Sequence, residues 1–470
     1  MRVLLVNPPI PHKFRMIRYA DKKGKEAMSL RVMVGPPLAL NEIAGVIPDE
    51  EILILDQKTE SDNNPQYDCI EGLIDTINEF RPDIVSFTCI TAQYNSVKKM
   101  LKYVKKVDKN IFTTVGGIHP TLCTGDFIDS SVDLITVGLG KASYRDIIKE
   151  LKVNGRDNAD FSHIPGLAFT DGASLKYTKL LCKLSYKEIK ENYVLDNIMP
   201  NRELTDKYNY IIPHENKRIQ YISTSQGCTH KCNFCSIWPI TDGRYFHKDV
   251  ELIINEIKHM ERYEIIRFCD ANTFGDLKQA KLLFNRIIEE GLDNHEYIVD
   301  VRTDFVIEHP KIMELAYKAG VRVAICGLES IDDEELRRYK KNNTVKNTKE
   351  ALKILNEMGI KVNGNYIISP EHDADYFEKL AYFVDENPIF HSGFTILTPF
   401  PGTEQWEMYK DRITINNFDY YNLTNAVFET VLPEREFYSR ISELYKIAAK
   451  SRAKYLMINN KKNSVDSNTV

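Results

Sequence analysis

Three cysteines, Cys228, Cys232 and Cys235, are crowded into the segment SQGCTHKCNFCSIWP with the spacing C-x3-C-x2-C. Thiolates are metal ligands, and three of them in one loop can face a single metal centre. A four-iron cluster normally takes four thiolates, so three would leave one iron with an open position that can hold a substrate. A structural zinc is the alternative, with His230 or His247 as the fourth ligand.

The composition is that of a soluble globular protein without an electrostatic case for nucleic acid as its partner. Of the 470 residues, 43% are hydrophobic and 27% charged, and the net charge is −5. No apolar run approaches the ~20 residues of a transmembrane segment, and the apolar start is too short for a signal peptide. We therefore expect a cytoplasmic protein of two or three domains. In that reducing compartment, its nine cysteines favour metal ligation over a disulfide framework.

The chain begins with a domain, residues 1–150, that is separate from the one that carries these thiols. Five β-rich runs alternate there with helical patterns, which predicts a Rossmann-like, doubly wound parallel sheet. Ligands of such sheets bind beyond the carboxyl ends of the strands. The runs are residues 2–7, 51–56, 83–88, 111–117 and 133–138.

Residues 216–405 repeat the alternation with six longer β/α units. This pattern predicts a partial (β/α)6 version of the eight-stranded barrel, with its chemistry at the carboxyl ends of the strands. The cysteine triplet begins four residues after the first run and therefore lies at that end. The runs are residues 219–224, 265–270, 297–302, 321–329, 360–368 and 394–400.

Two segments lack this rhythm. Residues 151–215 are turn-rich and read as a linker segment with room for one small hairpin. Residues 406–470 form a short helical extension, and its polar tail from residue 459 is expected to be disordered. The aromatic stretch 418–428 either caps a pocket or packs the last helix, and we favour packing.

The triplet, its place after the first barrel strand and the aromatic Phe234 before the last cysteine resemble the radical S-adenosylmethionine (SAM) enzymes. The resemblance implies a [4Fe-4S] cluster on Cys228, Cys232 and Cys235, whose open iron chelates SAM. One electron from a reductase, flavodoxin or ferredoxin then releases a 5′-deoxyadenosyl radical, which abstracts hydrogen from an unactivated carbon. Such an oxygen-labile cluster implies an anaerobic or low-oxygen cytoplasm.

Four further residues fall where this family contacts SAM. By resemblance, Phe234 lies beside the cofactor, Asp270 binds its amino group, Arg302 pairs with its carboxylate and Glu329 binds the ribose hydroxyls. A helix N-cap is the alternative for Asp270, and a surface acid that opens a loop is the alternative for Glu329. No catalytic residue beyond the cluster ligands is assigned.

The first domain resembles the cobalamin-binding domain that is fused to one class of radical SAM enzymes. The resemblance rests on residues 35–47 and on the stretches DIVSFTCITAQYNSVKKM, TTVGGIHPTL and VDLITVGLGKASYRDIIKEL. Two features depart from the class: GLGK replaces an acidic run, and no D-x-H-x-x-G supplies a lower ligand. One alternative is that the domain binds a different ligand. Another is that His119, one of the contacts named next, has a structural role. The implied cobalamin contacts are Ser86, Thr88, Thr91, Gly116, Gly117, His119, Gly138 and Gly140.

The resemblance implies a cobalamin-dependent methyltransferase that acts on an unactivated carbon of a small or lipid-like substrate, with a second SAM remethylating the cobalamin. An oxidative cyclase or rearrangement enzyme built from the same parts is the alternative, and a non-catalytic zinc-binding protein is a minor one. A methylthiotransferase fits less well because its first domain carries cluster cysteines, one of them very near the start. Without that first cysteine, we interpret Cys89 and Cys123 as packing or incidental residues. Cys269 and Cys326 lie in apolar strands, and we interpret them as packing residues.

Overall fold

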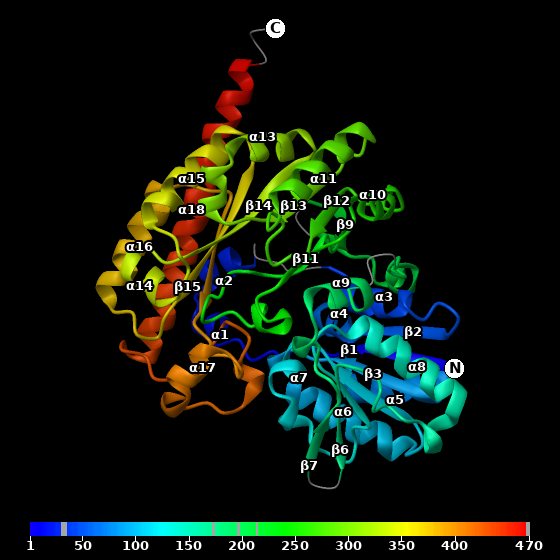
Figure 1. Cartoon of the computed structure of the whole chain (residues 1–470). Helices are drawn as coiled ribbons and strands as arrows, with labels where there is room; N and C mark the ends of the chain where they lie inside the picture. The colour runs from blue at the N-terminus through cyan, green and yellow to red at the C-terminus, as the bar shows by residue number, and fades with distance from the viewer. Residues whose placement is uncertain (30–34, 172–173, 195–197, 213–214, 467–470) are drawn as a thin grey trace.

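The chain folds into two α/β lobes, each built on its own mainly parallel sheet, and a long helix that lies along the second lobe (Figure 1). The computed structural model describes residues 1–29, 35–171, 174–194, 198–212 and 215–466. In both lobes consecutive parallel strands are joined through helices, as the sequence predicts. The expected class, a doubly wound lobe followed by a partial barrel, is confirmed.

The first lobe contains a seven-stranded sheet with the strand order β2-β1-β3-β4-β5-β6-β7. The five predicted strands are present and parallel. The hairpin expected in the linker segment also exists, and it pairs antiparallel with β5 and so extends this sheet. The strands are β1 (Arg2–Asn7), β2 (Glu51–Asp56), β3 (Ile84–Thr88), β4 (Phe112–Gly116), β5 (Leu134–Thr136), β6 (Leu167–Asp171) and β7 (Ser174–Tyr177).

Helices cover both faces of the first sheet, because its central strands are apolar on both sides. Helices α5 and α6 pack on one face, and α3 and α8 pack on the other. The helices of this lobe are α3 (Leu38–Gly45), α4 (Gln57–Asn63), α5 (Cys69–Phe80), α6 (Tyr94–Val107), α7 (Ile118–Leu122) and α8 (Gly140–Asn158).

The second lobe is an open half-barrel of six parallel strands in the order β16-β15-β14-β13-β12-β9, and β8 adds an antiparallel edge. All six predicted runs form strands, which confirms the (β/α)6 prediction. The strands are β8 (Ile211–Ile212), β9 (Lys217–Ile222), β12 (Ile265–Phe268), β13 (Glu296–Asp300), β14 (Val321–Glu329), β15 (Lys361–Ile368) and β16 (His391–Ile396).

The helices of the second lobe bury one face of this sheet in a large apolar core. They lie on the outside of the half-barrel, as Figure 1 shows. They are α10 (Val250–Lys258), α11 (Leu277–Glu289), α12 (Thr303–Glu308), α13 (Pro310–Lys318), α14 (Asp333–Arg338), α15 (Val345–Glu357) and α16 (Ala374–Glu386).

The two ends of the chain meet on the second lobe. Helices α1 (Arg15–Tyr19) and α2 (Lys22–Met28) leave the first lobe and pack against α18 (Glu434–Asp466). Helix α18 continues through the region expected to be a disordered tail, and residues 467–470 lie outside the described residues. The buried side chains that α1, α2 and the residue between them add to the second core are Met16, Ala20, Ala27 and Met28.

The aromatic stretch 418–428 packs, as predicted, and part of it meets the last helix. Ala426 belongs to the core that α18 helps to form, and its N–H donates to the Tyr438 hydroxyl at 2.9 Å. Tyr421 and Phe428 are buried against the ends of β15 and β16 and against α17 (Glu404–Tyr409), and the last helix is not part of this cluster. Phe418 instead reaches the first lobe, where its ring lies 5.3 Å from that of His119. The extension therefore joins the two lobes.

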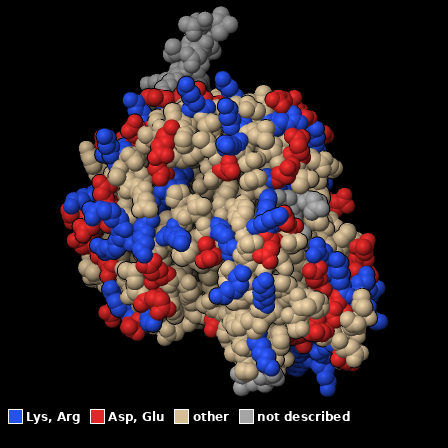
Figure 2. Space-filling view, viewed as in Figure 1, with Lys and Arg blue, Asp and Glu red and all other residues tan. Residues whose placement is uncertain are grey.

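The surface gives no further hint of a partner on the face that Figure 2 displays, where acidic and basic side chains are interspersed. Among the described residues, no helix is long and apolar enough to cross a bilayer.

Candidate functional site

The cysteine triplet lies in a loop that a short antiparallel ladder closes at its base. The strands of this ladder are β10 (Ser225–Gly227) and β11 (Tyr245–His247). The loop follows β9 and is therefore at the predicted end of the barrel. Gly227 has a φ of +83°, and a Cβ atom there would lie 2.1 Å from the carbonyl oxygen of Arg244. Only glycine fits at this entry to the loop.

The distances between the three sulfurs bear on the choice between a single zinc ion and a larger cluster. Cys228, Cys232 and Cys235 are free thiols, the middle one buried and the others half-buried. A tetrahedral zinc with bonds of about 2.3 Å would hold its sulfurs about 3.8 Å apart. Within the described part of the chain, the triplet does not form a group with all ligand atoms within 4.8 Å, with or without His230 or His247. This spacing argues against the zinc alternative.

Two cations face the triplet. Burial raises the pKa of all three thiols, and the charges of Lys341 and Arg302 oppose that shift at Cys228 and Cys232. The Sγ atom of Cys235 also accepts a hydrogen bond from a backbone N–H at 3.4 Å. Since a cluster held by thiolates is rich in negative charge, nearby cations and N–H donors stabilise it.

Lys341 is a site residue that no local sequence pattern marks. Its side chain is buried, and its Nζ atom lies 2.7 Å from Oε1 of Glu329. Burial opposes the charge of Lys341, but Glu329 and Cys232 outweigh burial and raise its pKa. The lysine therefore keeps a positive charge between the cluster cysteines and the end of β14, where it can hold a carboxylate of a bound molecule.

Glu329 ends β14 in the left-handed region, with a φ of +61° that is uncommon for a residue with a side chain. It is only 8% exposed, so the interpretation as a surface acid is wrong. A Cβ atom on Gly327 would lie 2.2 Å from Oε1 of Glu329 and 2.8 Å from Nζ of Lys341. Gly327 thus leaves the space in which this ion pair forms, and the contact of Glu329 with ribose stays a prediction.

Asp270 fastens the start of the cysteine loop. Its Oδ1 atom accepts backbone N–H groups of Thr224 at 2.8 Å and Ser225 at 2.9 Å, and its Oδ2 atom accepts the Thr224 hydroxyl. The N-cap interpretation is wrong, because the cap of α11 is Asp276. Since both oxygens of Asp270 already have partners, its contact with the SAM amino group stays a prediction.

Arg302 and Phe234 also have partners within the chain. The guanidinium of Arg302 donates to the Asp304 carboxylate at 2.6 Å and to the carbonyl oxygen of Lys341 at 2.7 Å. Phe234 packs edge-on against Tyr339, with ring centroids 5.7 Å apart. Both residues lie at the triplet end of the barrel, and their roles toward SAM stay predictions.

A cavity of about 230 Å³, here called the edge cavity, lies between the first sheet and helices α3 and α8. Two of the predicted cobalamin residues, Thr91 and His119, do not line it. They lie next to each other, with Nδ1 of His119 3.3 Å from the Thr91 hydroxyl, and their contacts with cobalamin stay predictions. The six predicted residues that do line the edge cavity are Ser86, Thr88, Gly116, Gly117, Gly138 and Gly140.

The lining of the edge cavity suits an amide-bearing ligand. Thr114 donates to the Ser86 hydroxyl at 2.8 Å, and Ser86 and Tyr144 share a hydrogen bond of 2.6 Å at the cavity wall. Gln226 lines the cavity too, and its buried Oε1 atom has no hydrogen-bond partner. An unpaired buried acceptor costs about 1–3 kcal/mol, so the site favours a ligand that donates an N–H to Gln226. No sequence motif marks this residue.

The four cysteines interpreted as packing or incidental residues divide into two pairs. Cys89 and Cys326 are buried in the cores of the two lobes, as predicted. Cys269 is half-buried beside Arg267, and Cys123 is half-buried within reach of His119. This second pair is less buried than the first, and its role in packing stays a prediction.

Comparisons with known proteins identify the two domains. Residues 222–384 match the model of the Radical SAM superfamily, and residues 28–148 match the model of the B12 binding domain. The hopanoid C-3 methylase of Methylococcus capsulatus is 25% identical over 80% of this chain and 70% of that protein. The anaerobic magnesium-protoporphyrin IX monomethyl ester cyclase of Rubrivivax gelatinosus is 24% identical over 87% of this chain and 73% of that protein.

A solved structure shares the fold. The cobalamin-dependent SAM radical enzyme OxsB, with aqua-cobalamin and SAM bound, superimposes with a TM-score of 0.67 at 15% identity. The match covers 92% of this chain and 64% of the OxsB chain, which is less than two thirds of that protein.

We predict that Gly227→Ala lowers the iron content of the reconstituted protein. Alanine at this φ adds about 1–3 kcal/mol of strain, and its methyl group would overlap a backbone oxygen that cannot move alone. Iron per chain measures the effect, with Gly125→Ala as the control, since a Cβ atom there meets nothing within 4 Å. Equal iron content in both variants would contradict this account of the loop.

Gly327→Ala is expected to weaken SAM binding about tenfold, the equivalent of one lost charged hydrogen bond. The new methyl group would separate Glu329 from Lys341 without removing either charge. Calorimetric titration of SAM into the iron-loaded protein measures the effect, and unchanged iron content shows that the cysteine loop is intact. Unaltered affinity would remove the ion pair from the SAM site.

Proposed function

We propose that this chain, which joins a B12-binding domain to a radical SAM domain, is a cobalamin-dependent methyltransferase that acts on an unactivated carbon. One observation carries the proposal: Gln226 lines the edge cavity, and the cluster ligands begin two residues later at Cys228. A single short segment therefore carries one residue of the cavity that we assign to cobalamin and the first cysteine that we assign to the cluster. When bound, the cluster with SAM supplies a 5′-deoxyadenosyl radical, and cobalamin supplies the methyl group.

The chain's own contribution is placement and exclusion of water. Asp270 and Gly227 hold the cysteine loop in position, and the buried pair of Glu329 and Lys341 presents both charges beside it. Phe234 packs against a cluster of apolar side chains at the ends of β15 and β16, which excludes water there. Shielding of this kind protects a reactive radical from solvent.

The inner face of the half-barrel favours a small polar substrate over a lipid. Register and alternation place Arg267 of β12, Asp300 of β13 and Asn363 of β15 on one face, opposite the apolar face under the helices. Nε of Arg267 and Oδ1 of Asn363 are buried without hydrogen-bond partners. Burial raises the pKa of Asp300 to about 6. Such unpaired polar atoms suit a substrate that supplies hydrogen bonds.

Radical-based ring closure is the second candidate, and the similarity to the Rubrivivax cyclase favours it. A cyclase would use the same cluster, SAM and cobalamin sites, so the two candidates differ in the product and in the fate of the SAM methyl group.

We also propose that the protein works in the cytoplasm with a reductase, flavodoxin or ferredoxin as its electron donor. All nine cysteines are free thiols, a pattern typical of a reducing compartment. A cluster that must be reduced before each turnover requires such a donor.

Methyl-labelled SAM separates the two candidates. We expect the reduced, cobalamin-loaded protein to transfer label into the aqueous fraction of an extract of its own cells, and to form 5′-deoxyadenosine and S-adenosylhomocysteine in equal amounts. Label in the organic fraction would contradict the polar substrate. Turnover that gives 5′-deoxyadenosine and a new product without label would favour the cyclase.

Asn363→Leu is expected to abolish this labelling while iron and cobalt contents stay unchanged, because it removes a polar group from the inner face alone. The matched control is Asn154→Leu on the exposed surface of α8. Full labelling by the Asn363 variant would place the substrate elsewhere.

A further inference from the structure

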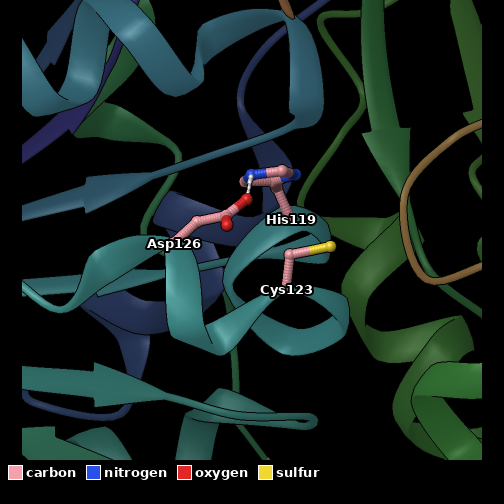
Figure 3. A group of neighbouring side chains, drawn as sticks. All are labelled: His119, Cys123 and Asp126. Carbon is pink, nitrogen blue, oxygen red and sulfur yellow. Dashed lines mark ion pairs between the residues drawn. The ribbon is translucent and has the colours of Figure 1, made fainter. Parts of the chain in front are cut away.

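The loop after β4 brings together three side chains of metal-ligand type that belong neither to the cysteine triplet nor to the lining of the edge cavity. His119 lies on α7, Cys123 directly follows that helix, and Asp126 lies in the next helical turn. The spacings of four and three residues bring the three side chains to one side of the turn. In Figure 3 the side chains of His119 and Asp126 meet, and the Cys123 thiol lies beside them.

We propose that His119, Cys123 and Asp126 bind a divalent transition metal ion, with zinc as the best fit. Nε2 of His119 lies 3.1 Å from Oδ2 of Asp126. One ligand atom from each of the three residues lies within 4.8 Å of the other two, which holds for no other such trio in the described part of the chain. A nitrogen, a thiolate and a carboxylate are the donor types that zinc takes, with water in the fourth position.

The imidazole of His119 supplies the independent evidence for a ligand. The residue is 1% exposed, and its Nε2 atom has no hydrogen-bond partner despite the nearby carboxylate. In the tautomer whose Nδ1–H donates to Thr91, Nε2 carries a lone pair directed toward the carboxylate of Asp126. The Nε2 lone pair and the carboxylate oxygen repel each other at this distance unless a cation lies between them. A hydrogen bond from Nδ1–H, such as the one to Thr91, is what usually orients a metal-ligating histidine.

A plain ion pair between His119 and Asp126 accounts for less of this geometry. It would leave Nε2 without a hydrogen bond of good geometry, and it would give no reason for Cys123 to lie within reach. A metal ion uses all three side chains at once. Asp126 is 38% exposed at its side chain, which leaves a path for the ion and for a water ligand.

The site lies where the first lobe meets the rest of the chain. The His119 ring packs against Phe418 of the extension and Tyr94 of α6, with centroid distances of 5.3 and 5.0 Å. One residue before Cys123, Leu122 is so close to Gly402 of the second lobe that a Cβ atom there would approach it to 2.7 Å. A metal ion would therefore stabilise the loop on which the two lobes dock.

Zinc retention by the complete protein tests the proposal independently of methyl transfer. Protein loaded with iron and cobalamin is equilibrated with zinc and then passed through a metal-free column without oxygen. We expect the wild-type protein to retain about one zinc per chain. Cys123→Ala and Asp126→Asn should each retain at least about tenfold less zinc, with their iron content unchanged. Cys182→Ala, which removes an exposed thiol, is the matched control and should keep its zinc.

X-ray absorption at the zinc edge identifies the site. One sulfur at about 2.3 Å with nitrogen and oxygen at about 2.0 Å is the expected shell, whereas three sulfurs would place the zinc at the cluster cysteines and overturn the assignment. The proposal also fails if folded wild-type protein keeps no zinc, or if both variants keep it. Since Asp126 is partly exposed, its variant should fold even where a Cys123 variant does not.

Discussion

One buried carboxylate, that of Asp270, ties the cysteine loop to the sheet on which the rest of the site is built. It sits just beyond β12 and accepts the two backbone N–H groups that begin the next segment after β9. Neighbouring parallel strands are thereby locked at their carboxyl ends, where a loop would otherwise be free to move. Gly227 then turns the chain. Gln226, before the turn, lines the edge cavity, and Cys228, after it, is the first cysteine of the triplet.

Buried charge is the second constraint, and it carries a cost that only partners offset. Glu329 and Lys341 are each 8% exposed and hold each other at 2.7 Å. Removing either one would leave an uncompensated charge in a low-dielectric interior, at a cost of about 3–5 kcal/mol. A buried ion pair of this kind adds little net stability, so we interpret Glu329 and Lys341 as residues that bind a polar ligand. Their charges interact more strongly with such a ligand because the site holds little water.

Local patterns predicted the strands, and the topology of parallel sheets predicted the ends at which ligand residues gather. Apolar runs alone marked all eleven parallel strands, and the cysteine spacing marked the loop after β9 that we assign to the cluster. Lys341 was missed because the chain returns to Glu329 only after α14, twelve residues later. The position of the His119 side chain, which does not line the edge cavity, also depends on rings from α6 and from the extension. Contacts between segments this far apart leave no periodic trace in the sequence.

The iron and cobalt contents of protein purified without oxygen, from cells grown with cobalamin, test the central claim most directly. The account predicts about four irons per chain and near-stoichiometric cobalt, with the absorption of both cofactors, and loss of the iron alone in Cys232→Ala. Iron without cobalt, even after reconstitution, would contradict the role of the edge cavity. Zinc in place of iron at the cysteine triplet would contradict the whole account.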